Sequence, residues 1–331
     1  MLDTSIRIGT LTLKNRLVMP PMHTGRATDD GHATEDLANY YFERAKHSAP
    51  GLIIMEHSCI TEAGRASKTQ LSIASDDRIE DHRMLTDAIH AGGAKVFVQL
   101  NHAGAAAQPF EPRENVSASA VALPLGKLNR GVPRALTEDE ILLLQERFAE
   151  AAVRAIQAGY DGVEIHSAYG YLLDQFYSPL TNRRGDAYGA LSIESRTRFL
   201  RETMTRLRSV IGADIPMAVR LGGADYTPGG ATEEDAVEAC RLLEAAGADL
   251  LDLSGGMCSY VRPGHPEAGY FGSMTAKIKA AVTVPVLLTG GVQTVADAEA
   301  LLREGKADLI GVGRALFKDA HWREHSLSKE G

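Results

Sequence analysis

The order of apolar and helical segments in this sequence predicts an α/β fold, a closed (β/α)8 TIM barrel with a short N-terminal β-hairpin. Eight short apolar segments, each suited to a buried strand, alternate with segments of helical spacing. No change in composition and no Pro/Ser-rich linker interrupts this alternation. We therefore expect residues 1–331 to form a single domain.

The hairpin and the first barrel strand lie within the first twenty residues. Residues 6–13, IRIGTLTL, alternate apolar and polar about Gly9, as expected for a hairpin. Residues 16–19 form a short strand that stops at Pro20 and Pro21, because proline has no N–H to donate to a sheet. The segment PPMHT thus lies just beyond the end of this strand.

The remaining elements follow in regular order. The further strands are expected at residues 51–56, 95–100, 162–166, 216–221, 250–254, 286–289 and 309–313, and the helices at residues 34–47, 81–91, 138–158, 193–210, 232–246, 273–281 and 294–304. Several helices begin after a residue suited to the N-cap and end at a glycine that can adopt the left-handed conformation. The N-cap residues are Thr137, Ser192, Thr232 and Thr294, and the glycines are Gly92, Gly159, Gly247 and Gly305.

A doubly wound open sheet that binds a dinucleotide is the rival fold. It would require a GxGxxG motif after an early strand, with an acidic residue about 20 positions later. The sequence contains no such fingerprint, so the barrel is preferred.

Composition argues against several classes of protein. The net charge of -8, the pI near 5.8 and the lack of a long basic run argue against a nucleic-acid surface. No apolar run approaches the roughly 18 residues that span a bilayer, and residues 1–10 do not resemble a signal peptide. Cys59, Cys240 and Cys258 are far apart and form no CxxC pair, so we expect neither a metal site nor a disulfide. A cytoplasmic protein is expected.

In such a barrel, residues at the ends of the strands line one mouth, where the chemistry takes place. The fourth strand delivers His166, Tyr169 and Tyr171 together. His166 could instead be a satisfied core histidine, with the two tyrosines as packing residues. Further candidates at the ends of the first three strands are Pro21, Met22, His23, His57, Gln99 and His102.

Arg220 lies inside the fifth strand, in the segment MAVRL. A guanidinium in a buried strand cannot lose its proton, so it needs an anion or strong acceptors nearby. Two partners fit this requirement, a buried carboxylate or an electron-rich ligand.

Glycines mark the ends of the seventh and eighth strands, in the segments TGG and GVGR. Bare backbone N–H groups at this position commonly hold a phosphate in barrels, and Arg314 adds a charged, fork-shaped donor. Gly290 and Gly291 could instead simply form a tight turn. A phosphate bound here could belong to a cofactor or to a metabolite.

Five motifs in series resemble the Old Yellow Enzyme family of FMN-dependent ene-reductases. They are LKNRLVMPPM (13–22), VQLNHAG (98–104), VEIHSAYGYLLDQFYSPLTNRRGDAYG (163–189), an arginine strand followed by DY (220–226) and GVGR (311–314). The resemblance runs over almost the whole chain in the right order. It implies a single-domain flavoprotein with FMN as cofactor and NAD(P)H as transient reductant. A small-molecule substrate and a homo-oligomer are family-level expectations.

The resemblance also implies which residues bind the cofactor. Gln99 would bind the pyrimidine edge of the flavin, and Arg220 would stabilise the negative charge that reduced flavin carries near N1 and O2. Gly291, Gly313 and Arg314 would hold the phosphate. The other implied cofactor residues are Pro20, Pro21 and Met22 behind the ring, His23 at its edge, His57 and Gly290.

For catalysis, the resemblance implies that His166 and Tyr169 hydrogen-bond the carbonyl or nitro oxygen of an activated alkene. Flavin N5 would give a hydride to the alkene in a ping-pong reaction, and Tyr171 would be the general acid. Several residues depart from the family pattern, three of them at the site. Tyr169 replaces a histidine or asparagine, His23 replaces a cysteine or threonine, and His57 replaces a small residue.

Two other functions stay open on the residues alone. A non-redox barrel enzyme, such as a lyase or isomerase, could use the same glycines for a phosphorylated metabolite. A flavin-binding protein without turnover could retain the motifs. We prefer the ene-reductase, because the five motifs occur together.

Overall fold

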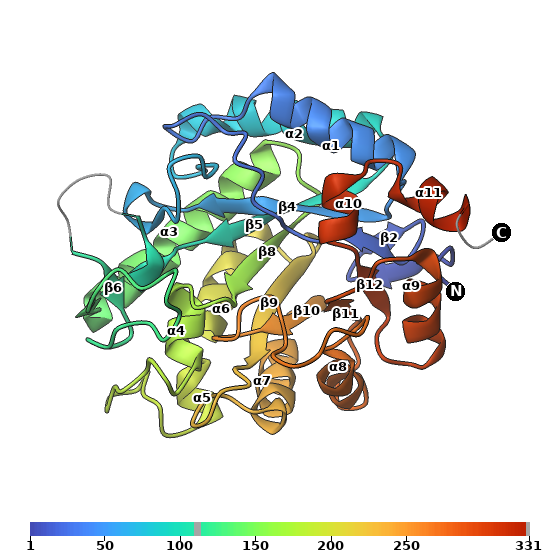
Figure 1. Ribbon diagram of the computed structural model, residues 1–331. Helices are drawn as coiled ribbons and strands as arrows, with labels where there is room; N and C mark the ends of the chain where they lie inside the picture. Colours follow the sequence, from blue (N-terminus) through green and yellow to red (C-terminus); the bar gives the residue numbers. More distant parts are fainter. Residues whose placement is uncertain (109–113, 329–331) are drawn as a thin grey trace.

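A computed structural model describes residues 1–108 and 114–328 of the protein. Its parallel strands close into a barrel in the order β10-β11-β12-β3-β4-β5-β8-β9 (Figure 1). The strands are β3 (Leu17–Met19), β4 (Leu52–Cys59), β5 (Lys95–Asn101), β8 (Gly162–Ser167), β9 (Met217–Ala224), β10 (Leu250–Gly255), β11 (Val286–Thr289) and β12 (Leu309–Gly311). The predicted barrel is confirmed.

The predicted N-terminal hairpin is also present, as β1 (Ile6–Ile8) and β2 (Leu11–Leu13), paired antiparallel. Ile8 and Leu13 are fully buried in one apolar cluster with inward residues of the barrel strands. Phe97 belongs to this cluster, and a Cβ at Gly162 would lie 2.5 Å from its ring. The hairpin and Phe97 therefore help to fill one end of the barrel, and the site must lie at the other end.

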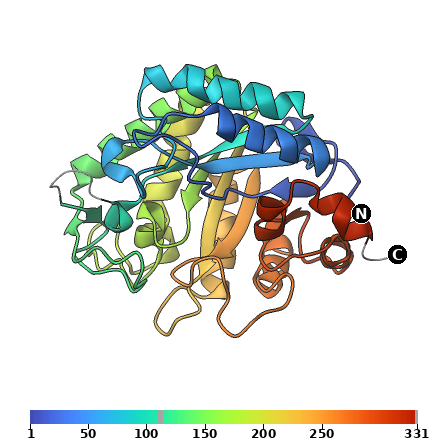
Figure 2. The ribbon, with the colours of Figure 1, turned by 45° about the horizontal axis from the view of Figure 1, so that its top comes forward.

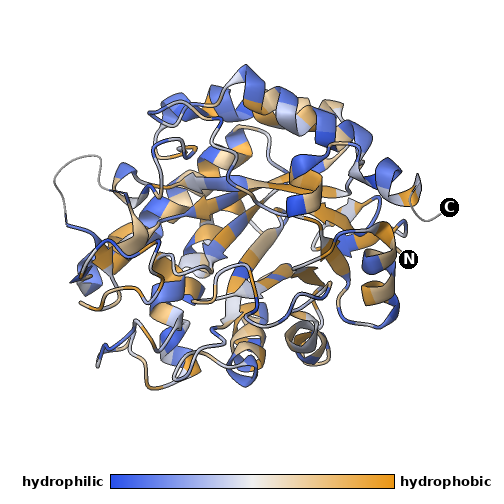
Figure 3. Cartoon of the chain, viewed as in Figure 1, coloured by the Kyte–Doolittle hydropathy of each residue, from blue (hydrophilic) through white to orange (hydrophobic). Residues whose placement is uncertain are grey.

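Helices surround the strands in both ribbon views (Figures 1 and 2). They are α1 (Glu35–His47), α2 (Ile79–Ala91), α3 (Glu138–Gln157), α6 (Arg198–Ile211), α7 (Glu233–Ala245), α8 (Gly272–Lys279) and α9 (Val295–Arg303). Figure 3 shows apolar residues concentrated on the strands and on the helix faces that cover them. This is the distribution that burial of amphipathic helices against a barrel produces.

The predicted N-caps are confirmed. The side chains of Thr137, Ser192, Thr232 and Thr294 each accept a hydrogen bond from the backbone three residues on. Glycines 159, 247 and 305 have the predicted positive φ.

The prediction of a left-handed Gly92 is wrong, because Gly92 has φ -76° and its neighbour Gly93 has φ 85°. A side chain at Gly92 would still be excluded, since a Cβ there would lie 2.5 Å from the Cβ of Ala45.

The helix expected at 193–210 is divided at Thr197 into α5 (Ile193–Arg196) and α6. The Thr197 hydroxyl donates to the carbonyl of Ile193 at 2.7 Å, a local bond that competes with the regular helical pattern. Several short elements were not predicted: α4 (Leu172–Tyr177), α10 (Arg314–Lys318), α11 (Trp322–Ser328), and the paired strands β6 (Val116–Ser117) and β7 (Arg134–Ala135). Their brevity leaves too few residues for a periodic signal.

The interior of the barrel changes character along its axis. The inward residues near the hairpin are apolar, among them Val18, Leu250 and Leu287. Two residues further along the strands, the inward positions become polar and charged while remaining buried; they include Gln99, Glu164, Arg220 and Asp252. Because side chains alternate along a strand, this polar layer lies directly above the apolar one and faces the carboxyl ends of the strands.

Replacing Phe97 with alanine tests the role of the apolar layer. We expect the free energy of unfolding to fall by about 3–5 kcal/mol, because the ring is fully buried and its removal leaves a cavity. Urea denaturation measures the change. Leu191→Ala is the control, since Leu191 is 94% exposed and should change stability little. A Phe97→Ala variant as stable as this control would contradict the assignment.

Candidate active site

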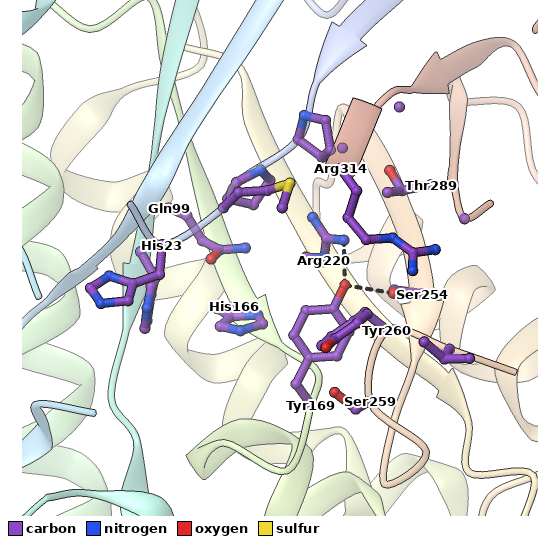
Figure 4. Close-up of a pocket in the computed structure, with 18 of the residues that line it drawn as sticks. His23, Gln99, His166, Tyr169, Arg220, Ser254, Ser259, Tyr260, Thr289 and Arg314 are labelled. Atoms are coloured by element: carbon purple, nitrogen blue, oxygen red, sulfur yellow. Dashed lines mark hydrogen bonds between the residues drawn. The ribbon is translucent and has the colours of Figure 1, made fainter. Parts of the chain in front are cut away.

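A cavity of about 710 Å³ lies at the carboxyl ends of the barrel strands, away from the hairpin. Figure 4 shows residues that line it. Every predicted catalytic and cofactor-binding residue lines it: Pro20, Pro21, Met22, His23, His57, Gln99, His166, Tyr169, Tyr171, Arg220, Gly290, Gly291, Gly313 and Arg314. His102, which the sequence also suggested, is buried and is not among the lining residues. Residues from distant parts of the chain thus meet in one chamber, whose size suits a small ligand or cofactor.

His57 was predicted to follow a strand, but it lies within β4. The register between β4 and β5 shifts between Met55 and Ser58, so Glu56 and His57 oppose the single residue Gln99. Such a β-bulge re-aims a side chain. The bulge lets His57 line the cavity although the strand continues beyond it.

The turn after β8 presents the two tyrosines. Tyr169 and Gly170 both have positive φ, 61° and 75°, and Tyr171 then forms the N-cap of α4. A tyrosine rarely adopts this conformation, so the surroundings must hold it. The carboxylate of Asp174 does so in part, because its Oδ2 accepts from the backbone N–H of Gly170 at 2.7 Å.

Tyr169 and Tyr171 both pack edge to face against His166. Its ring centroid lies 5.5 Å from that of Tyr169 and 5.1 Å from that of Tyr171. Burial lowers the pKa of His166 well below its ordinary value and raises the pKa of Tyr171 to about 12. His166 is therefore neutral and Tyr171 protonated near neutral pH. Nδ1 of His166 is buried without a hydrogen-bond partner among the described residues, which does not fit a satisfied core histidine.

Arg220 has both kinds of partner that the sequence left open. Its Nη1 lies 2.9 Å from Oδ2 of Asp252, which confirms the buried carboxylate. Its Nη2 donates to the hydroxyl of Tyr169 at 2.5 Å, and this hydroxyl also lies 2.7 Å from Oγ of Ser254. The guanidinium also lines the cavity, so it can face an electron-rich ligand as well.

Sequence reasoning missed Glu164, which completes the polar layer beneath the cavity. Nε2 of Gln99 donates to its Oε1 at 2.8 Å. Burial, and then the charge of Asp252, raise the pKa of Glu164 well above its ordinary value. Burial likewise raises the pKa of Asp252 to about 6, although Arg220 opposes this shift. Carboxylates inside the apolar segments VEIH and LDLS, beside an arginine strand, were the available signal.

The glycines at the ends of β11 and β12 leave bare backbone around the cavity. Gly291 has φ 72°, and a Cβ there would lie 2.6 Å from the carbonyl oxygen of Glu267. A Cβ at Gly290 would lie 2.7 Å from the ring of Tyr270, and one at Gly313 would lie 3.1 Å from Sδ of Met22. A tight turn at Gly290 and Gly291 does not exclude a phosphate cradle. Arg314, a possible phosphate donor, lines the same cavity.

Two loops complete the walls and were also missed. Leu125, Lys127 and Leu128 come from the segment before β7, and Tyr260 and Val261 come from the segment after β10. Loop conformations of this kind leave no periodic pattern in a sequence.

The described part of the chain contains no group of three or more His, Cys, Asp or Glu residues that could hold a metal ion. No helix among residues 1–108 and 114–328 is long and apolar enough to cross a membrane.

Comparison with known proteins places these features in a family. Residues 2–329 match the model of the NADH:flavin oxidoreductase / NADH oxidase family. An NADH oxidase from Thermoanaerobacter brockii is 38% identical over 98% of this chain, and the chain spans about half (50%) of that relative's length. An NADPH dehydrogenase from Halalkalibacterium halodurans is 37% identical, with 98% of this chain and 94% of the relative covered.

Solved structures of similar proteins agree with this match. An old yellow enzyme homologue from Zymomonas mobilis has a TM-score of 0.87 and 31% identity, covering 100% of this chain and 93% of that one. Morphinone reductase in complex with tetrahydroNAD has a TM-score of 0.84 and 26% identity, covering 100% of this chain and 91% of that one.

Glu164→Gln tests the buried carboxyl layer through the pH dependence of stability. Because the pKa of Glu164 is raised on folding, the unfolded chain releases this proton first as pH rises, and the free energy of unfolding falls. Glutamine cannot titrate and resembles the protonated carboxyl. We expect the fall in the free energy of unfolding between about pH 5 and about pH 8 to be smaller in Glu164→Gln than in wild type, by on the order of 1 kcal/mol or more. Urea unfolding at each pH measures it.

Glu238→Gln serves as the control, because Glu238 is exposed on α7. If the free energy of unfolding falls with pH as much in Glu164→Gln as in wild type, the Glu164 carboxyl does not hold its proton in the folded protein.

Proposed function

Because the chain belongs to the NADH:flavin oxidoreductase / NADH oxidase family, we propose that it is an FMN-dependent NAD(P)H oxidoreductase that reduces the C=C bond of activated alkenes. The observation that carries this proposal is that the ring cluster, Arg220 and the two glycine-bearing strand ends line one cavity. A ring acid, a fixed cation and a phosphate cradle in one chamber suit a flavin mononucleotide with a substrate beside it. The printed names of the relatives, NADH oxidase and NADPH dehydrogenase, support a nicotinamide reductant.

The residues present fit FMN. A Cβ at Gly291 would clash with the backbone of Glu267, and one at Gly313 would crowd Met22. Arg314 supplies a cation for a phosphate. Nη1 of Arg220 pairs with Asp252, whereas its Nε has no hydrogen-bond partner in the described chain. The guanidinium lines the cavity and can therefore also serve a ligand there. Pro20, Pro21, Met22, His23 and Gln99 form the remaining wall that would hold the flavin ring.

When bound, FMN would accept a hydride from NAD(P)H and pass it to the alkene. The role of the protein's own residues is to hold the substrate and to supply the proton. His166 and Tyr169 are the sequence-predicted pair for the activating oxygen, where negative charge grows as the reaction proceeds. The Tyr171 hydroxyl stays protonated because burial raises its pKa to about 12, so it can protonate the alkene carbon. A homo-oligomer and a cytoplasmic location remain predictions.

The colour of the purified protein tests the proposal directly. We expect the absorption of oxidised flavin, bleaching by NADPH without oxygen, and recovery of the colour on adding 2-cyclohexenone. A colourless protein that does not take up FMN would contradict the cofactor assignment. Bleached protein that 2-cyclohexenone cannot reoxidise would leave a flavoprotein without this alkene reduction.

Tyr171→Phe separates proton donation from flavin reduction. We expect reoxidation by 2-cyclohexenone to slow by roughly 100-fold or more, while reduction by NADPH changes little, because only the alkene needs the proton. Stopped-flow absorbance measures each half-reaction. Tyr40→Phe is the matched control, since the Tyr40 hydroxyl bonds the carbonyl of Phe317 and does not line the cavity. Equal losses in both half-reactions would remove Tyr171 from the acid role.

A further inference from the structure

The hydrogen bonds around His57 fix which of its ring nitrogens carries the proton. Nε2 of Gln70 lies 3.0 Å from Nδ1 of His57, and Nδ2 of Asn101 lies 3.2 Å from the same atom. The orientation of the Gln70 amide follows from its other end, because the backbone N–H of Ala66 donates to its Oε1 at 2.6 Å. The NH2 group of Gln70 must therefore face His57.

An NH2 group can only donate, so Nδ1 of His57 must accept. A neutral imidazole that accepts at Nδ1 carries its proton on Nε2. The ring is neutral at working pH, because burial first, and then His23, lower its pKa to about 3. His57 lines the cavity, its Nδ1 is held by Gln70 and Asn101, and its Nε2 has no hydrogen-bond partner among the described residues. Nε2–H is therefore a fixed donor that can serve a ligand.

Tyr169, by contrast, has its hydroxyl engaged elsewhere. The hydroxyl oxygen lies 2.5 Å from Nη2 of Arg220 and 2.7 Å from Oγ of Ser254 (Figure 4). Its ring packs edge to face against His166. The structure therefore places Tyr169 beside the cation of the polar layer and leaves His166 without its expected donor partner.

His57 is placed to supply that missing donor. The ring centroids of His57 and His166 lie 6.4 Å apart with an interplanar angle of 77°. An oxygen that accepts from a ring nitrogen lies roughly 4 Å from that ring's centroid, so two rings at this separation can share one oxygen. His57 also stacks on Tyr171, with centroids 5.6 Å apart and planes 15° from parallel. The shared oxygen would thus lie close to the predicted acid.

We propose that His57 and His166 together bind the activating oxygen of the substrate, and that Tyr169 instead positions Arg220. This inference rests on the proposed function and reassigns one member of its oxygen-binding pair. Gln70 is then a positioning residue, because it acts on the substrate only through the proton of His57. The substrates favoured are those with a strong acceptor oxygen conjugated to the alkene, such as enones and nitroalkenes, since both donors are neutral N–H groups.

Rates of alkene reduction test the reassignment. We expect His57→Leu to slow reoxidation of the reduced protein by 2-cyclohexenone by roughly 10- to 100-fold, and His57→Gln, which keeps an N–H donor, to recover part of the loss. Tyr169→Phe should slow reoxidation by 2-cyclohexenone less than His57→Leu does. The opposite order, with Tyr169→Phe the slower variant, would overturn the proposal. Wild-type protein that 2-cyclohexenone does not reoxidise would instead refute the proposed function.

Magnetic resonance of protein labelled with ¹⁵N-histidine tests the proton position without relying on turnover. In FMN-loaded wild-type protein, the His57 proton should reside on Nε2, and cyclohexanone, an unreactive ketone, should shift this N–H resonance. Gln70→Glu should move the proton to Nδ1, because a carboxylate accepts, and should slow alkene reduction with the ring still present. A wild-type proton on Nδ1, or an Nε2–H signal that responds to FMN but not to cyclohexanone, would overturn the proposal.

Discussion

The site is built around one cation enclosed in the barrel. Arg220 lies between the Asp252 carboxylate and the hydroxyl of Tyr169, and it is almost completely buried. Enclosing an unpaired guanidinium would cost several kcal/mol, so its neighbours are constrained. Asp252 offsets the charge, while burial, and then the nearby Asp252, raise the pKa of Glu164 so that it keeps its proton. The polar layer is therefore close to neutral as a whole while it presents a positive group to the cavity.

This arrangement links the fold to the chemistry. The apolar layer at the hairpin end closes the barrel, so the charged layer has access to ligands only from the opposite mouth. Gln99 links the polar layer to the cavity, because it donates to Glu164 on the neighbouring strand and also lines the cavity. A bound group at the mouth would thus interact with a preorganised set of dipoles and charges, which is the main source of electrostatic catalysis.

The sequence predicted the barrel, the hairpin and the strand-end residues that line the cavity, because strand alternation and polar residues at strand ends are local signals. It failed where structure depends on contacts distant in sequence. The position of His57, for example, depends on a bulge against β5. The bonds of the Tyr169 hydroxyl to Arg220 and Ser254 also could not be predicted, because they join residues 51 or more positions apart in the sequence.

The bulge in β4 has an evolutionary consequence. His57 is one of the two bulge residues opposite Gln99, and β4 and β5 resume their pairing at Ser58 and Leu100. The pairing of these strands therefore does not depend on the side chain at position 57. Position 57 can therefore exchange small, polar or aromatic side chains without disturbing the cylinder, whereas its neighbours in the ladder cannot. A substitution at position 57 can thus change what lines the cavity while the scaffold stays constant.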